Sequence, residues 1–134
     1  MPGPVLVVDD EPHIRKIIKL KLAPLGIETV EARDGLEAWE KLSSVRPALV
    51  ILDIMMPKLD GISFLKRARE TEEWKRLPVI IVSAVRDEEE RNRALSLGAL
   101  DVLWKPFSIS DLVAKVRRCI EAPPPAQDGA GQGA

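Results

Sequence analysis

The chain alternates short apolar runs with longer stretches in which apolar residues recur every three or four positions. Four runs rich in Val and Ile lie at residues 5–8, 48–52, 79–82 and 102–104. Runs of this length that are apolar throughout are typical of strands buried on both faces, as in a parallel sheet. A fifth run, at residues 27–32, alternates polar and apolar positions and therefore predicts a strand nearer the edge of the sheet.

Five intervening segments place their apolar residues at helical spacing. The first ends at Pro24 and Gly26 and has one apolar face, formed by Ile14, Ile17, Ile18 and Leu22. The second and third, at residues 35–43 and 62–70, are expected to turn inward Leu36, Trp39 and Leu42, and Ile62, Leu65 and Ala68. The fourth, at residues 88–97, has few apolar residues and should pack most loosely. The fifth follows capping serines at 108–110 and carries a stripe of Leu112, Val113, Val116, Cys119 and Ile120.

This alternation predicts a doubly wound α/β fold, in which a five-stranded parallel sheet has helices on both faces and right-handed crossovers. The 134 residues fit one domain with one core, which we assign to residues 1–122. Residues 123–134 begin with three prolines and continue in Gly, Ala and Gln, a composition that buries too little apolar surface to order itself. We interpret them as a disordered tail or a linker stub.

Composition narrows the classes of partner. With 20 Lys and Arg against 21 Asp and Glu, the formal net charge is -1, so no broad basic field attracts nucleic acid or an anionic membrane. The apolar runs are too short to span a bilayer, and no basic segment leads into a long apolar stretch. The single cysteine, Cys119, cannot form an internal disulfide, which suits a reducing compartment. We expect a cytoplasmic protein that contacts neither membranes nor nucleic acid directly.

Polar side chains follow four of the predicted strands at the point where each strand ends. Asp9, Asp10 and Glu11 follow the first, Asp53 the third, Ser83 the fourth and Lys105 the fifth. Because ligands of doubly wound sheets bind at the carboxyl ends of the strands, these side chains are expected to share one crevice. Three crowded carboxylates repel one another without a cation, and Mg²⁺ suits a site with few carboxylates, several waters and a phosphate oxygen.

The same residues fit phosphoryl transfer. That reaction needs mainly positioning and charge neutralisation, and a carboxylate can serve as its nucleophile. The Lys105 ammonium and the Ser83 hydroxyl are both suited to holding phosphate oxygens. The strand ends therefore predict a site that handles a phosphoryl group.

Four short motifs together resemble those of bacterial response-regulator receivers. They are VVDDEP at residues 7–12, LDIMMPKLDG at residues 52–61, Val82-Ser83-Ala84, and WKPF at residues 104–107. Each is weak alone, but the combination is highly specific and covers about residues 4–121. The resemblance implies a flavodoxin-like receiver fold and a signalling switch that catalyses only its own phosphotransfer and autodephosphorylation. The implied donor is a phosphohistidine on a sensor histidine kinase or a phosphotransfer protein.

The resemblance also implies a role for each site residue. Asp53 is the implied phosphoacceptor, Asp10 a direct Mg²⁺ ligand, and Asp9 an acidic partner that acts largely through water. Asp53 and the backbone carbonyl of Met55 complete the implied protein ligands. Ser83 is the implied switch hydroxyl that moves to the phosphoryl group, and Lys105 is its ion-pair partner. Pro106 follows the lysine, where the family often has a cis peptide bond.

One position departs from the family pattern. Receivers usually carry an aromatic residue three positions before the lysine, and its ring moves inward with the hydroxyl. This chain has Val102 there and contains no Tyr. We expect Trp104, next to Lys105, to point to the opposite face by strand alternation and so not to substitute for that ring.

The predicted output surface is the last two helices and the fifth strand. Here Arg91 with Asp111, and Asp101 with Lys115, resemble the charged pairs through which DNA-binding members of the family dimerise. The alternative is that these four residues are ordinary surface charges. A homodimer through this surface is therefore one of two interpretations.

Two other functions compete with the phosphoacceptor. Phosphohydrolases that form an aspartyl phosphate usually carry a second carboxylate two residues after the nucleophile, where this chain has Met55, and a cap domain that 134 residues do not accommodate. A degenerate receiver that acts as a phosphorylation-independent scaffold is disfavoured by the complete set of acidic, hydroxyl and lysine residues. His13, in the first helical turn, has no partners at ligand spacing and is predicted to be a surface residue.

Overall fold

The computed structural model describes residues 3–56 and 58–121 of the 134-residue chain. Five parallel strands form one sheet with the order β2-β1-β3-β4-β5. Their bounds are β1 Val5–Val8, β2 Thr29–Ala32, β3 Leu49–Asp53, β4 Val79–Ser83 and β5 Asp101–Trp104. The helices are α1 Pro12–Leu22, α2 Gly35–Val45, α3 Gly61–Arg69, α4 Glu88–Ser96 and α5 Ile109–Glu121, with a 3₁₀ turn at Ala23–Leu25 after α1.

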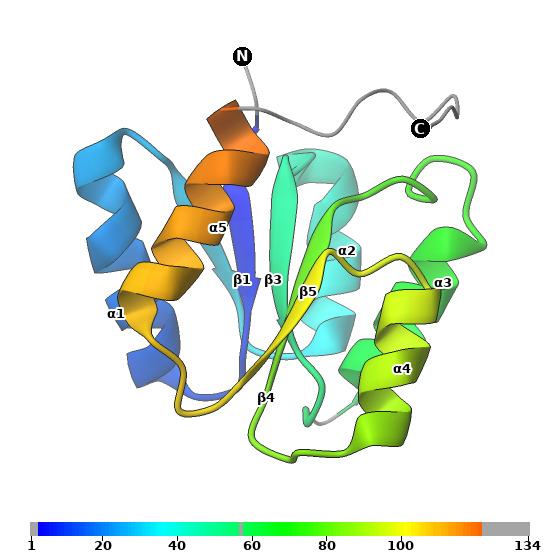
Figure 1. Ribbon diagram of the computed structural model, residues 1–134. Helices are drawn as coiled ribbons and strands as arrows, with labels where there is room; N and C mark the ends of the chain where they lie inside the picture. The colour runs from blue at the N-terminus through cyan, green and yellow to red at the C-terminus, as the bar shows by residue number, and fades with distance from the viewer. Residues whose placement is uncertain (1–2, 57, 122–134) are drawn as a thin grey trace.

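The helices cover both faces of the sheet (Figure 1). Helices α1 and α5 pack on one face over a core that includes Ile18, Leu112 and Val116. Helices α2, α3 and α4 pack on the other face over a larger core that includes Phe64 and Leu65. This arrangement confirms the predicted doubly wound α/β architecture. The predicted tail at residues 123–134 lies outside the described residues.

The sequence pattern accounts for the order of the strands. Every residue of β1, β3 and β4 is buried, because these strands lie inside the sheet and are covered by helices on both faces. Strand β2 is mostly half-buried and lies at one edge, as its alternating sequence predicts. It begins at Thr29 and is therefore two residues shorter than predicted.

Two apolar residues predicted to face the core are exposed instead. Ile17 on α1 is 43% exposed, and Leu36 on α2 is 41% exposed. The buried stripe of α2 consists of Gly35, Ala38 and Leu42, and Leu36 lies about 100° around the helix from Gly35. Two of these three residues are small, and a Cβ at Gly35 would collide with the backbone of Leu59, so a search for large apolar residues misses most of this stripe.

Helix α4 is held to the sheet by little apolar contact. Its N-terminus is capped by the Asp87 carboxylate, which accepts hydrogen bonds from the backbone N–H groups of Glu89 and Glu90. Ala94 is its one buried residue, which confirms the prediction that this helix packs most loosely. None of the helices in the described part of the chain is long and apolar enough to cross a membrane.

The start of α3 fixes the backbone at the end of β3. The Gly61 N–H donates to the Ile54 carbonyl at 3.0 Å, and a Cβ at this position would collide with the backbone of Asp53 and Ile54. Asp60 caps α3 by accepting a hydrogen bond from the Ser63 N–H. A glycine is therefore required where α3 approaches the end of β3 most closely.

Candidate functional site

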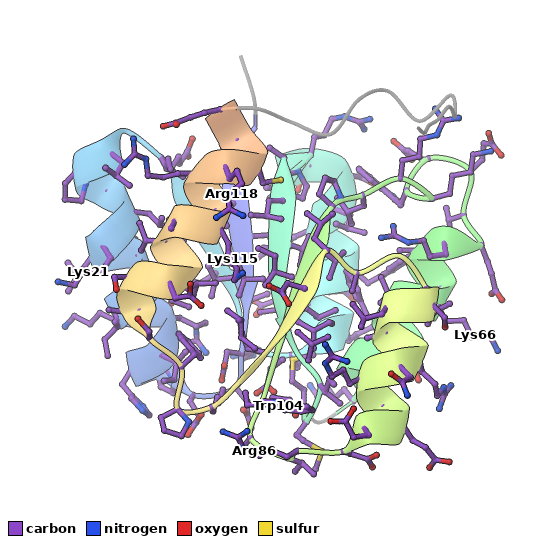
Figure 2. All side chains as sticks on the ribbon, viewed as in Figure 1. Lys21, Lys66, Arg86, Trp104, Lys115 and Arg118 are labelled. Carbon is purple, nitrogen blue, oxygen red and sulfur yellow. The ribbon has the colours of Figure 1, made fainter. Side chains whose placement is uncertain are left out.

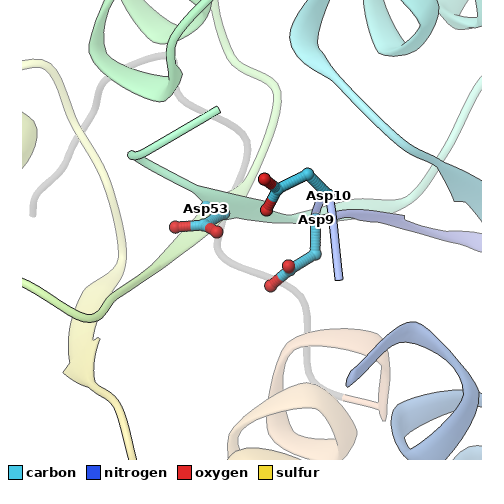
Figure 3. Close-up of side chains that lie close together, drawn as sticks. All are labelled: Asp9, Asp10 and Asp53. Carbon is cyan, nitrogen blue, oxygen red and sulfur yellow. The ribbon is translucent and has the colours of Figure 1, made fainter. Parts of the chain in front are cut away.

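Three carboxylates meet at the carboxyl ends of neighbouring strands (Figure 3). Asp9 and Asp10 follow β1, and Asp53 is the last residue of β3. One carboxylate oxygen from each lies within 4.8 Å of the others. Asp9 and Asp53 are buried, with exposed fractions of 1% and 3%, whereas Asp10 is exposed. The structure thus brings together the acidic residues that the sequence predicts at this edge.

Lys105, which follows β5, reaches into this acidic group. Its Nζ lies 2.9 Å from Asp9 Oδ2 and 3.2 Å from Asp53 Oδ2. Burial alone would lower the pKa of Lys105, but its close contacts with the carboxylates of Asp9, Glu11 and Asp53 outweigh burial and raise it. The lysine is therefore a permanent cation, shared between two buried carboxylates from different strands.

A third carboxylate, Glu11, also binds Lys105. Glu11 Oε1 lies 2.9 Å from Lys105 Nζ, and the Glu11 side chain is half-exposed at the opening of the site. The hydrogen bond from Lys105 lowers the pKa of Glu11. The sequence places Glu11 in the acidic run that follows β1 and so in the same crevice, but it predicts no separate role for this residue.

Asp53 is the most perturbed carboxylate of the site. Its pKa is raised from 3.8 to about 6, first by burial and then by the charge of Asp9. Lys105 and a hydrogen bond from the Met55 N–H to Asp53 Oδ1, at 3.2 Å, oppose that rise. One lysine therefore does not compensate the buried negative charge.

This imbalance predicts a pH-dependent stability in metal-free protein. The folded pKa of Asp53 is above its usual value, so its ionisation disfavours the folded state above about pH 6, and this penalty disappears as the pH falls towards 4. In EDTA we expect Asp53→Asn to raise the free energy of unfolding by about 1 to 2 kcal/mol near pH 8 and by little near pH 4. Urea unfolding at both pH values measures the difference, and an equal effect at both would contradict it.

The donor set fits a small divalent cation. Asp9 Oδ1 accepts a hydrogen bond from the Glu11 N–H, at 2.9 Å. Asp9 Oδ2 is buried, and although Lys105 Nζ is 2.9 Å away, that contact lacks hydrogen-bond geometry and no donor among the described residues completes it. A buried carboxylate oxygen without a donor beside two further carboxylates suits Mg²⁺, which prefers oxygen ligands at about 2.1 Å.

Ser83 ends β4 beside this group and is fully buried. Its Oγ accepts a hydrogen bond from the Val85 N–H and donates one to the Val85 carbonyl, both at 3.2 Å. In this arrangement the hydroxyl is satisfied by its own loop. An incoming group that hydrogen-bonds to Ser83 therefore has to break these contacts, which couples the site to the β4–α4 loop.

Trp104 corrects an expectation from the sequence. It lies on the same face as Val102, because the two residues are two positions apart on one strand, and both pack in the core beneath α2, α3 and α4. In the register of β4 with β5, Trp104 lies opposite Ser83. The guanidinium carbon of Arg86, on the β4–α4 loop, lies 5.9 Å from the centroid of a Trp104 ring (Figure 2). An aromatic ring is thus present beside Ser83.

An apolar cavity of about 580 Å³ opens next to Lys105. It lies between α1 and the segment that joins β5 to α5, and its lining includes Glu11, His13, Ile17, Lys105, Pro106 and Phe107. His13 is exposed, as predicted, but it lies on the wall of this cavity. The exposed side chain of Ile17 therefore lines an open cavity beside the acidic group.

The four charged residues of the predicted output surface are only partly paired. Lys115 Nζ on α5 lies 2.7 Å from Asp101 Oδ2 on β5, so this pair forms within one chain. Arg91 Nη1 lies 4.0 Å from Glu88 Oε1 on its own helix. Asp111 is exposed in the first turn of α5.

Comparison with known proteins decides the family. The model of the response regulator receiver domain matches residues 5–117. This chain belongs to the response regulator receiver domains. It is 38% identical over 134 residues to the response regulator MprA of Mycolicibacterium vanbaalenii, and this match covers all of this chain and 57% of that protein. It is 42% identical over 113 residues to the probable transcriptional regulator ycf27 of Cyanophora paradoxa, and this match covers 84% of this chain and 46% of that protein.

The solved structures agree with this assignment. The receiver domain of the Francisella response regulator 1452 matches with a TM-score of 0.81 and 39% identity, and the match covers 89% of this chain and 97% of that one. The present receiver also has the cis Lys105–Pro106 peptide bond that the resemblance implied. The chain spans about half the length of the curated relatives it matches, which are themselves response regulators or transcriptional regulators.

Proposed function

We propose that this receiver domain accepts a phosphoryl group onto Asp53 from a phosphohistidine of a sensor histidine kinase or phosphotransfer protein. The observation that carries the proposal is that Lys105 Nζ lies within 3.2 Å of buried carboxylates from two strands, Asp9 and Asp53. A lysine that serves only in a structural ion pair needs one carboxylate partner, whereas Lys105 has two buried ones. The excess negative charge at Asp53 favours a site built to receive a cation together with a phosphoryl group.

The proposed reaction forms one bond and breaks one. An Asp53 carboxylate oxygen attacks phosphorus, the bond from phosphorus to the donor nitrogen breaks, and its electron pair remains on the departing imidazole. Lys105 pairs with a phosphoryl oxygen, and the Ser83 hydroxyl leaves Val85 to donate to another. When bound, Mg²⁺ supplies the positive charge that offsets the phosphoryl oxygens. Asp9, Asp10, Asp53 and the Met55 carbonyl are its proposed ligands.

The donor is proposed to approach along the cavity next to Lys105. Apolar side chains of α1 and of the β5–α5 segment, among them Ile17 and Phe107, line its wall and suit the apolar face of a helix that carries the phosphohistidine. Lys105 lies at one end of that wall, so a donor bound there presents its phosphoryl group to Asp53. We infer a cytoplasmic location from this partner and from the single cysteine, Cys119, which is free and buried.

The output is proposed to be a conformational switch. Movement of the Ser83 hydroxyl to the phosphoryl group releases the Val85 backbone and changes the β4–α4 loop next to loosely held α4. Dimerisation through α4, β5 and α5 stays a proposal. It is supported by Leu95 and Leu100, exposed on α4 and just before β5, and by the opposite charges of exposed Asp111 and of Arg91, which is half-exposed and only 4.0 Å from Glu88.

The role of the metal has a direct test. Incubation with phosphoramidate in Mg²⁺ is expected to add one phosphoryl group per chain, seen by intact mass, and incubation in EDTA is expected to add none. Asp10→Asn removes an anionic ligand and is expected to weaken Mg²⁺ binding by about tenfold or more, whereas His13→Ala leaves it nearly unchanged. The binding titration follows tryptophan fluorescence, to which Trp104 beside Ser83 contributes.

Two outcomes would count against this function. Equal loss of Mg²⁺ affinity in both variants would remove Asp10 from the ligands. Absence of labelling from any donor in saturating Mg²⁺ would favour the alternative, a scaffold that acts without phosphorylation. The division into a receiver at residues 1–122 and a tail at 123–134 also stays a proposal.

A further inference from the structure

Glu11 occupies a position that the proposed reaction does not use. It directly precedes α1, yet its side chain makes no capping hydrogen bond to that helix. Its carboxylate binds Lys105 Nζ at 2.9 Å instead, and 48% of the side chain is exposed. The residue therefore places a charge at the opening of the site, where the acidic group meets the cavity beside α1.

The charge of Glu11 is in excess. When a divalent cation is bound, that ion and Lys105 together balance the three aspartates Asp9, Asp10 and Asp53. Among the described residues that line the adjacent cavity, Lys105 is the one lysine or arginine, and its charge is already counted against the three aspartates. A donor that approaches through this opening thus meets the negative charge of Glu11, which is half-exposed to solvent.

We propose that Glu11 selects among phosphoryl donors by the charge of the leaving group, favouring protonated nitrogen over acyl oxygen. This inference rests on the proposed function of Asp53. It adds a specificity residue to that function and predicts that the receiver discriminates against small acyl phosphates.

The chemistry of the two donor classes differs at the leaving atom. In a nitrogen-linked donor such as phosphoramidate or phosphohistidine, the nitrogen group is protonated and cationic, and it departs neutral when it takes the electron pair of the phosphorus–nitrogen bond. In acetyl phosphate the leaving group is a carboxylate, which departs as an anion when the phosphorus–oxygen bond breaks. A fixed negative charge at the opening stabilises the first donor and repels the second.

Glu11 acts on the donor through space, and its contact with Lys105 holds it in place. A side chain that merely positions Lys105 changes the rates with both donors by one factor. A charge that selects donors changes the ratio of the two rates. The ratio therefore separates selection from a structural role.

The experiment compares initial rates of phosphorylation by phosphoramidate and by acetyl phosphate in saturating Mg²⁺, measured by intact mass. In Glu11→Gln we expect the rate ratio to shift towards acetyl phosphate by about threefold or more, and to shift further in Glu11→Lys. The shift is expected to shrink as ionic strength rises, since both the charge and the donor are exposed to solvent. Glu40→Gln, an exposed glutamate on α2, is the matched control and leaves the ratio unchanged.

The variant Glu11→Asp separates the effect of the charge from the effect of the side-chain length. It keeps the negative charge on a shorter side chain, so the ratio stays near that of the wild type even where both rates change. An unchanged ratio in Glu11→Gln and Glu11→Lys, or the same shift in Glu11→Asp as in Glu11→Gln, would overturn the inference. Failure of both donors to label the wild type would instead overturn the proposed function of Asp53.

Discussion

Substitution of Asp53 by asparagine is expected to abolish phosphoryl labelling of the chain, a loss of more than about 100-fold in rate. The amide keeps the size of the side chain and can still accept the hydrogen bond from the Met55 N–H, so the backbone at the end of β3 is undisturbed. It lacks the anionic oxygen that attacks phosphorus. Intact mass after incubation with phosphoramidate in Mg²⁺ measures the loss.

The matched control for this variant is Asp111→Asn, which removes an exposed carboxylate in the first turn of α5 and should label like the wild type. Unfolding does not account for a loss in Asp53→Asn, because that variant is expected to be more stable than the wild type in metal-free buffer at neutral pH. Undiminished labelling of Asp53→Asn would show that another residue is the acceptor.

The second large effect concerns the lifetime of the phosphorylated state. Hydrolysis of an acyl phosphate needs a water molecule aligned with phosphorus, opposite the carboxylate that leaves, and polar side chains nearby can orient that water. The residues that flank the site, Met55 and Val85, are apolar, with exposed fractions of 54% and 44%. Neither hydrogen-bonds to water through its side chain, so we expect slow autodephosphorylation.

The double variant Met55→Asn with Val85→Glu is expected to lose its phosphoryl group faster by about tenfold or more, because both new side chains can orient the attacking water. The decay of phosphorylated protein in Mg²⁺, after removal of the donor, gives the rate. Met55→Leu with Val85→Ile is the control, since it keeps both positions apolar. A double polar variant that decays no faster would refute the shielding role of Met55 and Val85.

The sequence predicts the architecture well because the strands that form the centre of the sheet are apolar at every position. A continuous run such as residues 79–82 is compatible with burial on both faces and with little else. The convergence of Asp9, Asp53 and Lys105 follows in turn from the rule that parallel strands end at one edge. The prediction that these residues converge did not depend on their spacing along the chain.

Features that depend on packing in three dimensions were harder to predict. Leu36 and Ile17 have the right residue type for a core, but both are exposed, and on α2 the buried stripe includes Gly35, which lies against the backbone of Leu59. Trp104 is two positions from Val102 on the same strand, so both side chains lie on one face of the sheet. The expectation for Trp104 was wrong because it took the alternation from Lys105, the adjacent residue. The contact of Glu11 with Lys105 joins residues 94 positions apart and has no local signal beyond the adjacent acidic pair.

The most direct test of the account is chemical identification of the phosphorylated residue. Borohydride reduces an aspartyl phosphate to homoserine, so treatment of the phosphorylated receiver followed by peptide mass analysis marks the acceptor. We predict homoserine at position 53, formed only after incubation with donor and Mg²⁺. Homoserine at Asp9 or Asp10 instead, or none in protein whose intact mass shows a stable phosphoryl group, would contradict the assignment of Asp53.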